Sequence, residues 1–210
     1  MACTIVGVGT PAPRGPPLPT LAHLQGRARL HGDCDRVRGC RRLVEKTPHS
    51  VGFAEHLLTA FPRARLLYVT RHPVDTLGSY WRRNAIDPLK TWTGISVDRF
   101  CSRWETSATL ARRHAERHPN SFLTVRYEEF TDAPDKTFEA ICDFIGEPFA
   151  ADAIVAVPAE HPAWDIDPHL FGSIVRRTKL WEDHVGIADA RAVEDRLSDT
   201  MAMFGYERYT

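Results

Sequence analysis

The chain has 210 residues, which is enough for one compact domain with a sizeable core. Hydrophobic residues make up 43% of it and charged residues 26%, as in ordinary soluble globular proteins. Lysine plus arginine and aspartate plus glutamate each number 27, so the formal net charge is zero. This balance argues against a general nucleic-acid-binding protein.

The five cysteines form no C-x-x-C pair, and their number is odd. They predict a reducing compartment without a disulfide framework or a zinc site, and the ten histidines are likewise expected to hold no metal. No apolar stretch approaches the ~20 residues that span a membrane. The first residues, MACTIVGVGT, lack the basic region and the long apolar run of a signal peptide. We therefore expect a cytoplasmic protein with no membrane partner.

Residues 1–40 differ in composition from the remainder, because they hold five prolines, six glycines and five arginines but no lysine, glutamate or aromatic residue. Only TIVGV, at residues 4–8, predicts a strand. The prolines after it exclude a helix and favour extended backbone. We expect two segments, an atypical one over residues 1–40 and a folded domain over residues 41–210.

Helical and strand patterns alternate in the folded domain. Apolar residues at helical spacing predict helices over 49–61, from Pro73 to about Asn84, over 97–118, over 133–146 and from Asp189 to about Phe204. Apolar runs of β character predict strands over 64–70 and 121–130. Gly146 and Gly205 are expected to end helices, and residues 158–169 to form a loop. The alternation predicts an α/β class with a mainly parallel sheet.

The stretch LLYVTRHPVDTLGSY, residues 66–80, places an arginine directly after a buried strand and a serine eight residues later. Ligands of α/β folds bind at the carboxyl ends of parallel strands. There Arg71 can hold a phosphate with two parallel N–H bonds, and Ser79 can approach from the following helix. The alternative is that Arg71 pairs with Asp75 and that Ser79 has no such role.

A second strand end is predicted by VEKTP at residues 44–48, with Thr47 as a helix N-cap and Pro48 at the first helical position. Lys46, one of only four lysines, is then expected at the same carboxyl edge as Arg71. An ammonium there suits a mobile anionic group. The alternative is a solvated lysine that pairs with Glu45.

Five stretches, in this order, resemble the PAPS-dependent sulfotransferase family: VEKTP, FPRARLLYVTRHPVDTLGSY, VRYEEFTDAPDKTFEAICDFIGEPF, KLWEDHV and FGYE. The resemblance covers residues 44–210 and is strongest to the bacterial branch similar to protein-tyrosine and carbohydrate sulfotransferases. It implies a P-loop-NTPase-like three-layer fold. It also implies transfer of a sulfuryl group from PAPS (3′-phosphoadenosine-5′-phosphosulfate) to a hydroxyl or amine of a small-molecule, carbohydrate or peptide acceptor, without a metal.

The resemblance assigns roles around the donor to several residues. Arg71 and Ser79 match the pair that binds its 3′-phosphate, and Lys46 matches the lysine near its bridging oxygen and sulfuryl group. Tyr127 resembles a residue beside the adenosine.

Further roles concern the closing of the site and the proton of the acceptor. Arg177 and Lys179 lie where the family closes a basic loop over the donor. Glu45 and His49 are the candidates for the general base that removes the proton of the acceptor. The oligomeric state is not indicated by the sequence.

The chain departs from the family at its first phosphate loop, which has the form PRSGTT in relatives and is represented here by PRGPP at residues 13–17. Arg14 and Gly15 are retained, but the hydroxyls are lost and two prolines remove N–H donors. We therefore expect an N-terminally incomplete fold. Three explanations stay open: a wrong reading frame or start, a catalytically impaired donor-binding or scaffold relative, or activity restored by a partner or an unusual loop.

Overall fold

The computed structural model describes residues 2–7, 43–47, 50–86, 94–151 and 180–210. The chain forms two compact units. The sheet unit comprises Ala2–Tyr68 and Leu110–Thr124, and the helical unit comprises Val69–Thr109 and Val125–Thr210.

Strands and helices alternate along the described residues, as the sequence predicted. The strands are β1 (Ala2–Gly7), β2 (Leu43–Thr47), β3 (Arg65–Thr70) and β4 (Phe122–Arg126). The helices are η1 (Ser50–Phe53), α2 (Ala54–Ala60), α3 (Pro73–Ile86), α4 (Val97–Arg117), α5 (Tyr127–Asp132), α6 (Pro134–Ile145), η5 (Leu180–Asp183) and α7 (Ile187–Ala202), where η1 and η5 are short 3-10 helices. The predicted loop over residues 158–169 lies outside the described residues.

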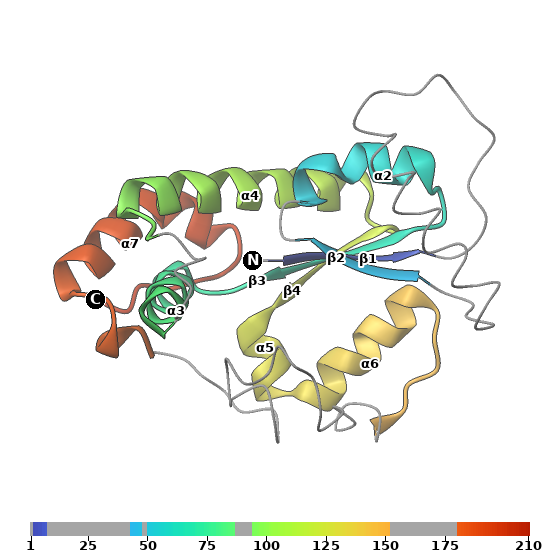
Figure 1. Ribbon diagram of the computed structural model, residues 1–210. Helices are drawn as coiled ribbons and strands as arrows, with labels where there is room; N and C mark the ends of the chain where they lie inside the picture. Colours follow the sequence, from blue (N-terminus) through green and yellow to red (C-terminus); the bar gives the residue numbers. More distant parts are fainter. Residues whose placement is uncertain (1, 8–42, 48–49, 87–93, 152–179) are drawn as a thin grey trace. The chain divides into compact units, whose positions relative to one another are not determined.

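The four strands form one sheet in the order β2-β1-β3-β4. β2, β3 and β4 run in the same direction (Figure 1), which fits the prediction of a mainly parallel sheet. β1 is the exception, because it pairs antiparallel with β2, with Gly7 opposite Leu43 and Thr4 opposite Lys46. The amide of Leu66 donates to the carbonyl of Ser121 at 2.8 Å where β3 and β4 begin.

The predicted strand over 121–130 is too long, because the chain turns into α5 at Tyr127. Glu128 and Glu129 lie in the first turn of α5, where the helix dipole favours carboxylates. The hydroxyl of Thr131 donates to the carbonyl of Glu128 at 3.0 Å, and the amide of Ala133 donates to the carbonyl of Glu129 at 3.0 Å. Local helical bonds therefore begin where the predicted strand was expected to continue.

The core of the helical unit lies between α3, α7, η5 and the first half of α4. Its fully buried side chains include Leu77 of α3, Trp104 of α4 and Leu197 of α7. Where α7 and α4 are exposed to solvent, the Arg196 guanidinium of α7 donates to Asp98 and to Ser102 of α4, at 2.9 Å each. Burial of one apolar stripe from each helix thus fixes where α3 lies in this unit.

Two predicted helix ends are confirmed by left-handed glycines. Gly146 has φ 71° and follows α6, and the amide of Glu147 donates to the carbonyl of Cys142 at 2.9 Å. Gly205 has φ 65° and lies three residues after α7. Only glycine adopts this conformation without steric cost, so both stops follow from the sequence.

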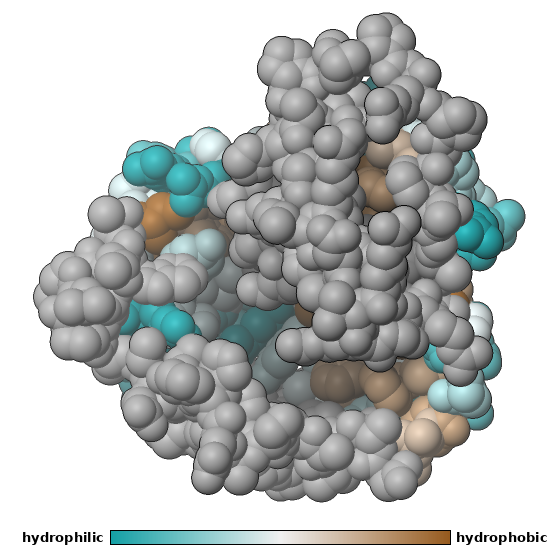
Figure 2. Space-filling view, turned by 45° about the vertical axis from the view of Figure 1, so that its right-hand side comes forward, coloured by the Kyte–Doolittle hydropathy of each residue, from teal (hydrophilic) through white to brown (hydrophobic). Residues whose placement is uncertain are grey.

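The surface mixes polar and apolar residues. Figure 2 shows apolar residues at several separate places on the face in view, with hydrophilic residues beside them. The exposed large hydrophobic residues come from different elements: Val44, Phe53, Ile187 and Met203. Among the helices that the structure describes, none has both the length and the apolar character needed to cross a lipid bilayer.

Gly78→Ala is expected to lower the free energy of unfolding by about 1–3 kcal/mol, because overpacking forces a close-packed interface apart. A Cβ at this position would lie 2.8 Å from the Cα of Trp181, which is backbone and cannot move aside alone. Urea denaturation followed by circular dichroism measures the change.

Gly52→Ala is the matched control, because its added Cβ meets nothing within 4 Å. We expect it to stay within about 0.5 kcal/mol of the wild type. Equal stability of both variants would show that α3 does not pack against η5 as described.

Candidate functional site

The turn between β3 and α3 is the centre of the candidate site. β3 ends at Thr70 and α3 begins at Pro73, so Arg71 and His72 form the connection. The amide and the hydroxyl of Thr76 both donate to the carbonyl of His72, at 2.9 Å and 3.0 Å, and close the first helical turn. Proline is preorganised for the first position of a helix. The predicted placement of Arg71 between a strand end and a helix start is therefore confirmed.

Arg71 and Tyr127 lie next to each other, although 56 residues separate them. The Arg71 Cζ lies 4.5 Å from the centroid of the Tyr127 ring. Arg71 follows β3, and Tyr127 follows β4 directly as the first residue of α5. The carboxyl ends of two neighbouring strands thus provide a cation and an aromatic ring that attract each other through the ring face.

His72 is a buried residue whose ring has both nitrogens in use. Its Nε2–H donates to the carbonyl of Glu207 at 2.9 Å, and its Nδ1 accepts from the amide of Val74 at 3.3 Å. This pair of partners requires the neutral Nε2–H tautomer. The His72 side chain therefore joins the turn to the last residues of the chain.

Burial lowers the pKa of His72 below its ordinary value. The Glu207 carbonyl and the carboxylates of Asp75, Glu194 and Glu128 act in the opposite direction, but desolvation outweighs them. The ring is therefore neutral at neutral pH, as its hydrogen bonds require.

Glu128 fixes the start of the turn from the side of α5. Its Oε1 accepts from the backbone amide of His72 at 2.9 Å, and its Oε2 accepts from the hydroxyl of Tyr206 at 3.0 Å. The Cζ of Arg126 lies 4.5 Å from the centroid of the Tyr206 ring. Burial and the neighbouring Glu128 carboxylate raise the pKa of Tyr206, so its hydroxyl stays protonated and donates.

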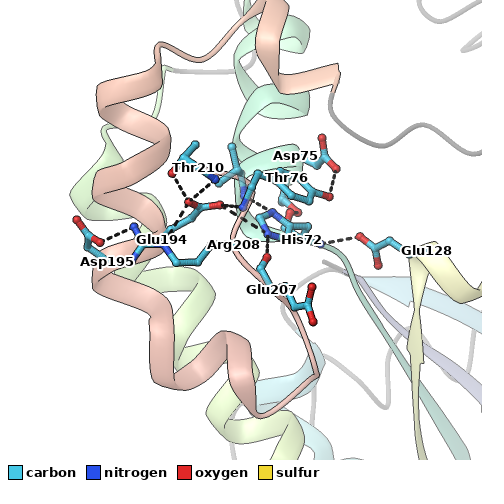
Figure 3. A network of polar contacts seen from close by, with 11 residues as sticks. His72, Asp75, Thr76, Glu128, Glu194, Asp195, Glu207, Arg208 and Thr210 are labelled. Atoms are coloured by element: carbon cyan, nitrogen blue, oxygen red, sulfur yellow. Dashed lines mark hydrogen bonds and ion pairs between the residues drawn. The ribbon is translucent and has the colours of Figure 1, made fainter.

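Glu194 of α7 anchors the last residues of the chain (Figure 3), and its side chain is fully buried. Its carboxylate accepts from the amide of Tyr209 at 2.6 Å and from the amide and hydroxyl of Thr210 at 3.3 Å and 2.5 Å. Arg208 Nε lies 3.7 Å from the same carboxylate, and His72 Nε2 lies 4.0 Å from it. A buried charge with this many donors is satisfied and holds the C-terminal segment against the turn.

Tyr209 covers the ring of His72. The two rings stack at 3.7 Å between centroids with an interplanar angle of 12°, and the hydroxyl of Tyr209 donates to Asp75 Oδ2 at 3.0 Å. Burial and the Asp75 carboxylate raise the pKa of Tyr209, which keeps the donor protonated. Trp181 stacks parallel to Tyr209 at 6.4 Å. The first turn of α3 is thus held on one side by an aromatic stack.

Sequence reasoning missed these positioning residues. The stretch FGYE carried part of the resemblance, but no role was assigned to the aromatic and acidic residues around it. The signal that the sequence offered for these positioning residues was the cluster of Tyr, Glu and Arg at residues 206–210.

The structure describes some of the other predicted site residues, and the rest lie outside the described ranges. Ser79 lies on α3 and is exposed to solvent. Glu45 and Lys46 lie in β2, where the backbone pairs them with Ile5 and Thr4. Outside the described residues lie Arg14, Gly15, His49, Arg177 and Lys179.

The direction of β1 differs from what a phosphate loop after the first strand requires. Gly7, at the carboxyl end of β1, lies opposite Leu43, where β2 begins. Phosphate loops follow the carboxyl ends of parallel strands, at the edge where the neighbouring strands also end. In this structure the chain leaves β1 at the other edge, away from Lys46 at the end of β2.

One group of potential metal ligands occurs among the described residues. Glu55, His114 and His118 each offer a ligand atom, and these atoms lie within 4.8 Å of one another. His114 and His118 are four residues apart, an H-x-x-x-H spacing that sequence analysis overlooked when it predicted no metal site.

Comparison with known proteins gives a consistent result. The model of a family described as "Sulfotransferase family" matches residues 19–151. The solved sulfotransferase domain from the curacin biosynthetic pathway has 16% identity and a TM-score of 0.57, over 90% of this chain and 72% of that domain. The sulfotransferase domain from the Synechococcus PCC 7002 olefin synthase has 22% identity and a TM-score of 0.55, over 77% of this chain and 57% of that one. No curated protein matches the chain.

These similarities confirm the predicted α/β class with a parallel sheet and a P-loop-like fold. The matched range includes Lys46, Arg71, Ser79 and Tyr127. It leaves out residues 13–17 and residues 177–179, where the remaining donor-binding residues were predicted.

Stability is expected to fall as the pH decreases below about 6.5, the ordinary pKa of histidine. The folded-state pKa of His72 lies below its unfolded value near 6.5, so the unfolded chain takes up the proton first. The contribution of His72 is complete above the unfolded pKa and is lost as the pH falls through the folded pKa. It accounts for at most about 1.4 kcal/mol per pH unit. Urea denaturation at several pH values measures the slope.

His72→Gln should reduce this slope, since glutamine does not titrate. The matched control is His56→Gln, which replaces an exposed histidine by the same residue. A slope that is the same in all three proteins would show that His72 is not held neutral in the folded state.

Proposed function

The chain belongs to the sulfotransferase family, and we propose that it transfers a sulfuryl group from PAPS to a hydroxyl or amine acceptor and releases PAP (3′-phosphoadenosine 5′-phosphate). The observation that carries this proposal is the juxtaposition of Arg71 and Tyr127 at the carboxyl ends of β3 and β4. It is the position at which an α/β fold binds a nucleotide.

The 3′-phosphate of the donor suits Arg71 and Ser79. The Arg71 Cζ lies over the Tyr127 ring, and the N–H groups of a guanidinium bind phosphate oxygens in pairs. The exposed hydroxyl of Ser79 offers a donor from α3. The partial positive charge at the start of this 14-residue helix favours an anion in the same place.

The contacts around the turn between β3 and α3 support binding of the 3′-phosphate without rearrangement of the turn. The chain that follows Arg71 is held by the hydrogen bonds of His72 with Glu128 and Glu207 and by the bond from Tyr209 to Asp75. A cation that is already positioned loses little conformational entropy when the phosphate binds.

The chemistry that we assign to the sulfuryl group of the donor comes from the family resemblance. The bond between sulfur and the bridging oxygen of PAPS breaks, a bond from the acceptor oxygen or nitrogen to sulfur forms, and the negative charge passes to PAP. Lys46 would stabilise the charge on the departing oxygen, and Glu45 or His49 would accept the acceptor's proton. Arg177 and Lys179 would close over the donor.

A second function is a catalytically impaired relative that binds the nucleotide or serves as a scaffold. The antiparallel direction of β1 favours it, because the retained Arg14 and Gly15 follow a strand whose carboxyl end lies beside the start of β2. Measuring PAP release from PAPS with phenolic and carbohydrate acceptors separates the two functions. Release that depends on the acceptor supports the transferase, whereas PAP binding without release supports the impaired relative.

The proposed setting is the reducing cytoplasm. Cys101 and Cys142 are buried free thiols. Burial raises the pKa of Cys101 to about 11, which makes its thiol unreactive. The donor nucleotide and a small-molecule, carbohydrate or peptide acceptor are the proposed partners.

Arg71→Ala is expected to weaken PAP binding by about 1.5–3 kcal/mol, or roughly 10- to 150-fold, because a charge-assisted hydrogen bond pair is lost. Ser79→Ala removes a neutral donor and should cost about 0.5–1.5 kcal/mol. Isothermal titration calorimetry with PAP and with AMP, which lacks the 3′-phosphate, measures both effects. The wild type should prefer PAP, and Arg71→Ala should lose that preference.

Arg191→Ala is the control, since this arginine is exposed on α7. It should bind PAP as tightly as the wild type. An Arg71→Ala protein that still distinguishes PAP from AMP would refute the assignment of the 3′-phosphate site.

A further inference from the structure

Three side chains of the sheet unit converge beside the end of α4. His114 lies in its last turn, and His118 follows the last helical residue directly. The amide of His118 still donates to the carbonyl of His114 at 2.8 Å, so helical geometry continues and both rings extend from one face. Glu55, from the first turn of α2, meets them there.

The distances between the ligand atoms are short. Glu55 Oε2 lies 3.0 Å from His118 Nε2, and Glu55 Oε1 lies 3.6 Å from His114 Nδ1. All three ligand atoms fall within 4.8 Å of one another. Donors around a small divalent cation, each about 2.0–2.2 Å from it, are separated by distances of this order.

The burial of His114 is a second observation that points to a ligand, and it is independent of the distances between the ligand atoms. Its side chain is 6% exposed, and neither ring nitrogen has a hydrogen-bond partner of acceptable geometry, although the backbone of Val51 comes near enough to favour the charged ring. Buried polar groups are nearly always satisfied, so an unsatisfied imidazole that faces a carboxylate calls for a ligand. Burial also lowers the pKa of His114, and a neutral imidazole is the form that binds metals.

Glu55 is suited to be the third metal ligand beside the two histidines. Its slight burial raises its pKa, but hydrogen bonds from His118 and Arg117 outweigh this and keep the pKa below the ordinary value. The carboxylate is therefore ionised. The exposed fractions of the Glu55 and His118 side chains are 44% and 30%, so a cation can reach them from solvent.

We propose that Glu55, His114 and His118 form a binding site for a divalent transition-metal cation of the zinc type. Two imidazoles and one carboxylate are borderline ligands that suit Zn²⁺ better than Mg²⁺ or Ca²⁺, which prefer oxygen alone. Water would fill the remaining coordination position. The bound cation joins α2 to the end of α4 within the sheet unit, and the proposal is independent of the sulfotransferase function.

Arg117 competes with the cation for Glu55. Its Nη1 lies 3.3 Å from Glu55 Oε1, and its side chain is more than half exposed, so it can turn away into solvent. Removing this guanidinium removes both the competing hydrogen bond and a nearby positive charge. The site should therefore bind metal more tightly in Arg117→Ala.

The test uses the full chain, freed of metal, and ZnCl₂ in competition with a chromophoric chelator. We expect one Zn²⁺ per chain, a raised melting temperature with Zn²⁺ but not with Mg²⁺, and at least tenfold weaker binding in Glu55→Gln and in His118→Ala. Both of these side chains are partly exposed, so these variants should fold. Arg117→Ala should bind severalfold more tightly, and His56→Ala, which removes the exposed neighbouring imidazole, should match the wild type.

Substitution with Co²⁺ identifies the ligands spectroscopically. A spectrum without a thiolate charge-transfer band, whose d–d absorption is lost in His118→Ala, would support the site. Three outcomes would overturn it: no Zn²⁺ binding, affinity unchanged in Glu55→Gln and His118→Ala, or a thiolate band that assigns the metal to cysteines.

Discussion

A neutral imidazole joins the turn before α3 to the last residues of the chain. His72 accepts from the amide of Val74 and donates to the carbonyl of Glu207, and no other protonation state satisfies both partners. Tyr209 stacks on the same ring and Glu128 holds the backbone amide. Because these contacts are buried, breaking one of them leaves unsatisfied groups out of reach of water. The position of Arg71 depends on this arrangement.

The acidic residues around the turn are engaged by donors. Glu194 binds the amides of Tyr209 and Thr210, Glu128 binds the turn amide and Tyr206, and Asp75 binds the hydroxyl of Tyr209. The carboxylates of Glu194 and Glu128 thus position backbone amides, and the carboxylate of Asp75 positions the Tyr209 side chain. Arg71 lies against the ring of Tyr127 at the strand ends, an arrangement that suits a phosphate ligand.

Local pattern was sufficient for much of the fold. Apolar spacing located the main helices, the glycines at 146 and 205 located two helix ends, and the Arg-His-Pro run located the turn. The network around His72 was not predictable, because its partners lie as far as 135 residues away in the sequence. The direction of β1 depends equally on a distant partner strand. The pairing of Arg71 with Tyr127 was foreseen only as two separate roles from a family resemblance.

The most direct test of the central claim is a crystal structure of the chain with PAP. The account predicts the 3′-phosphate within hydrogen-bond distance of the Arg71 guanidinium and the Ser79 hydroxyl, with the adenosine beside Tyr127 and the His72 contacts unchanged. A 3′-phosphate bound elsewhere, or a nucleotide held while Arg71 contacts only protein, would contradict it.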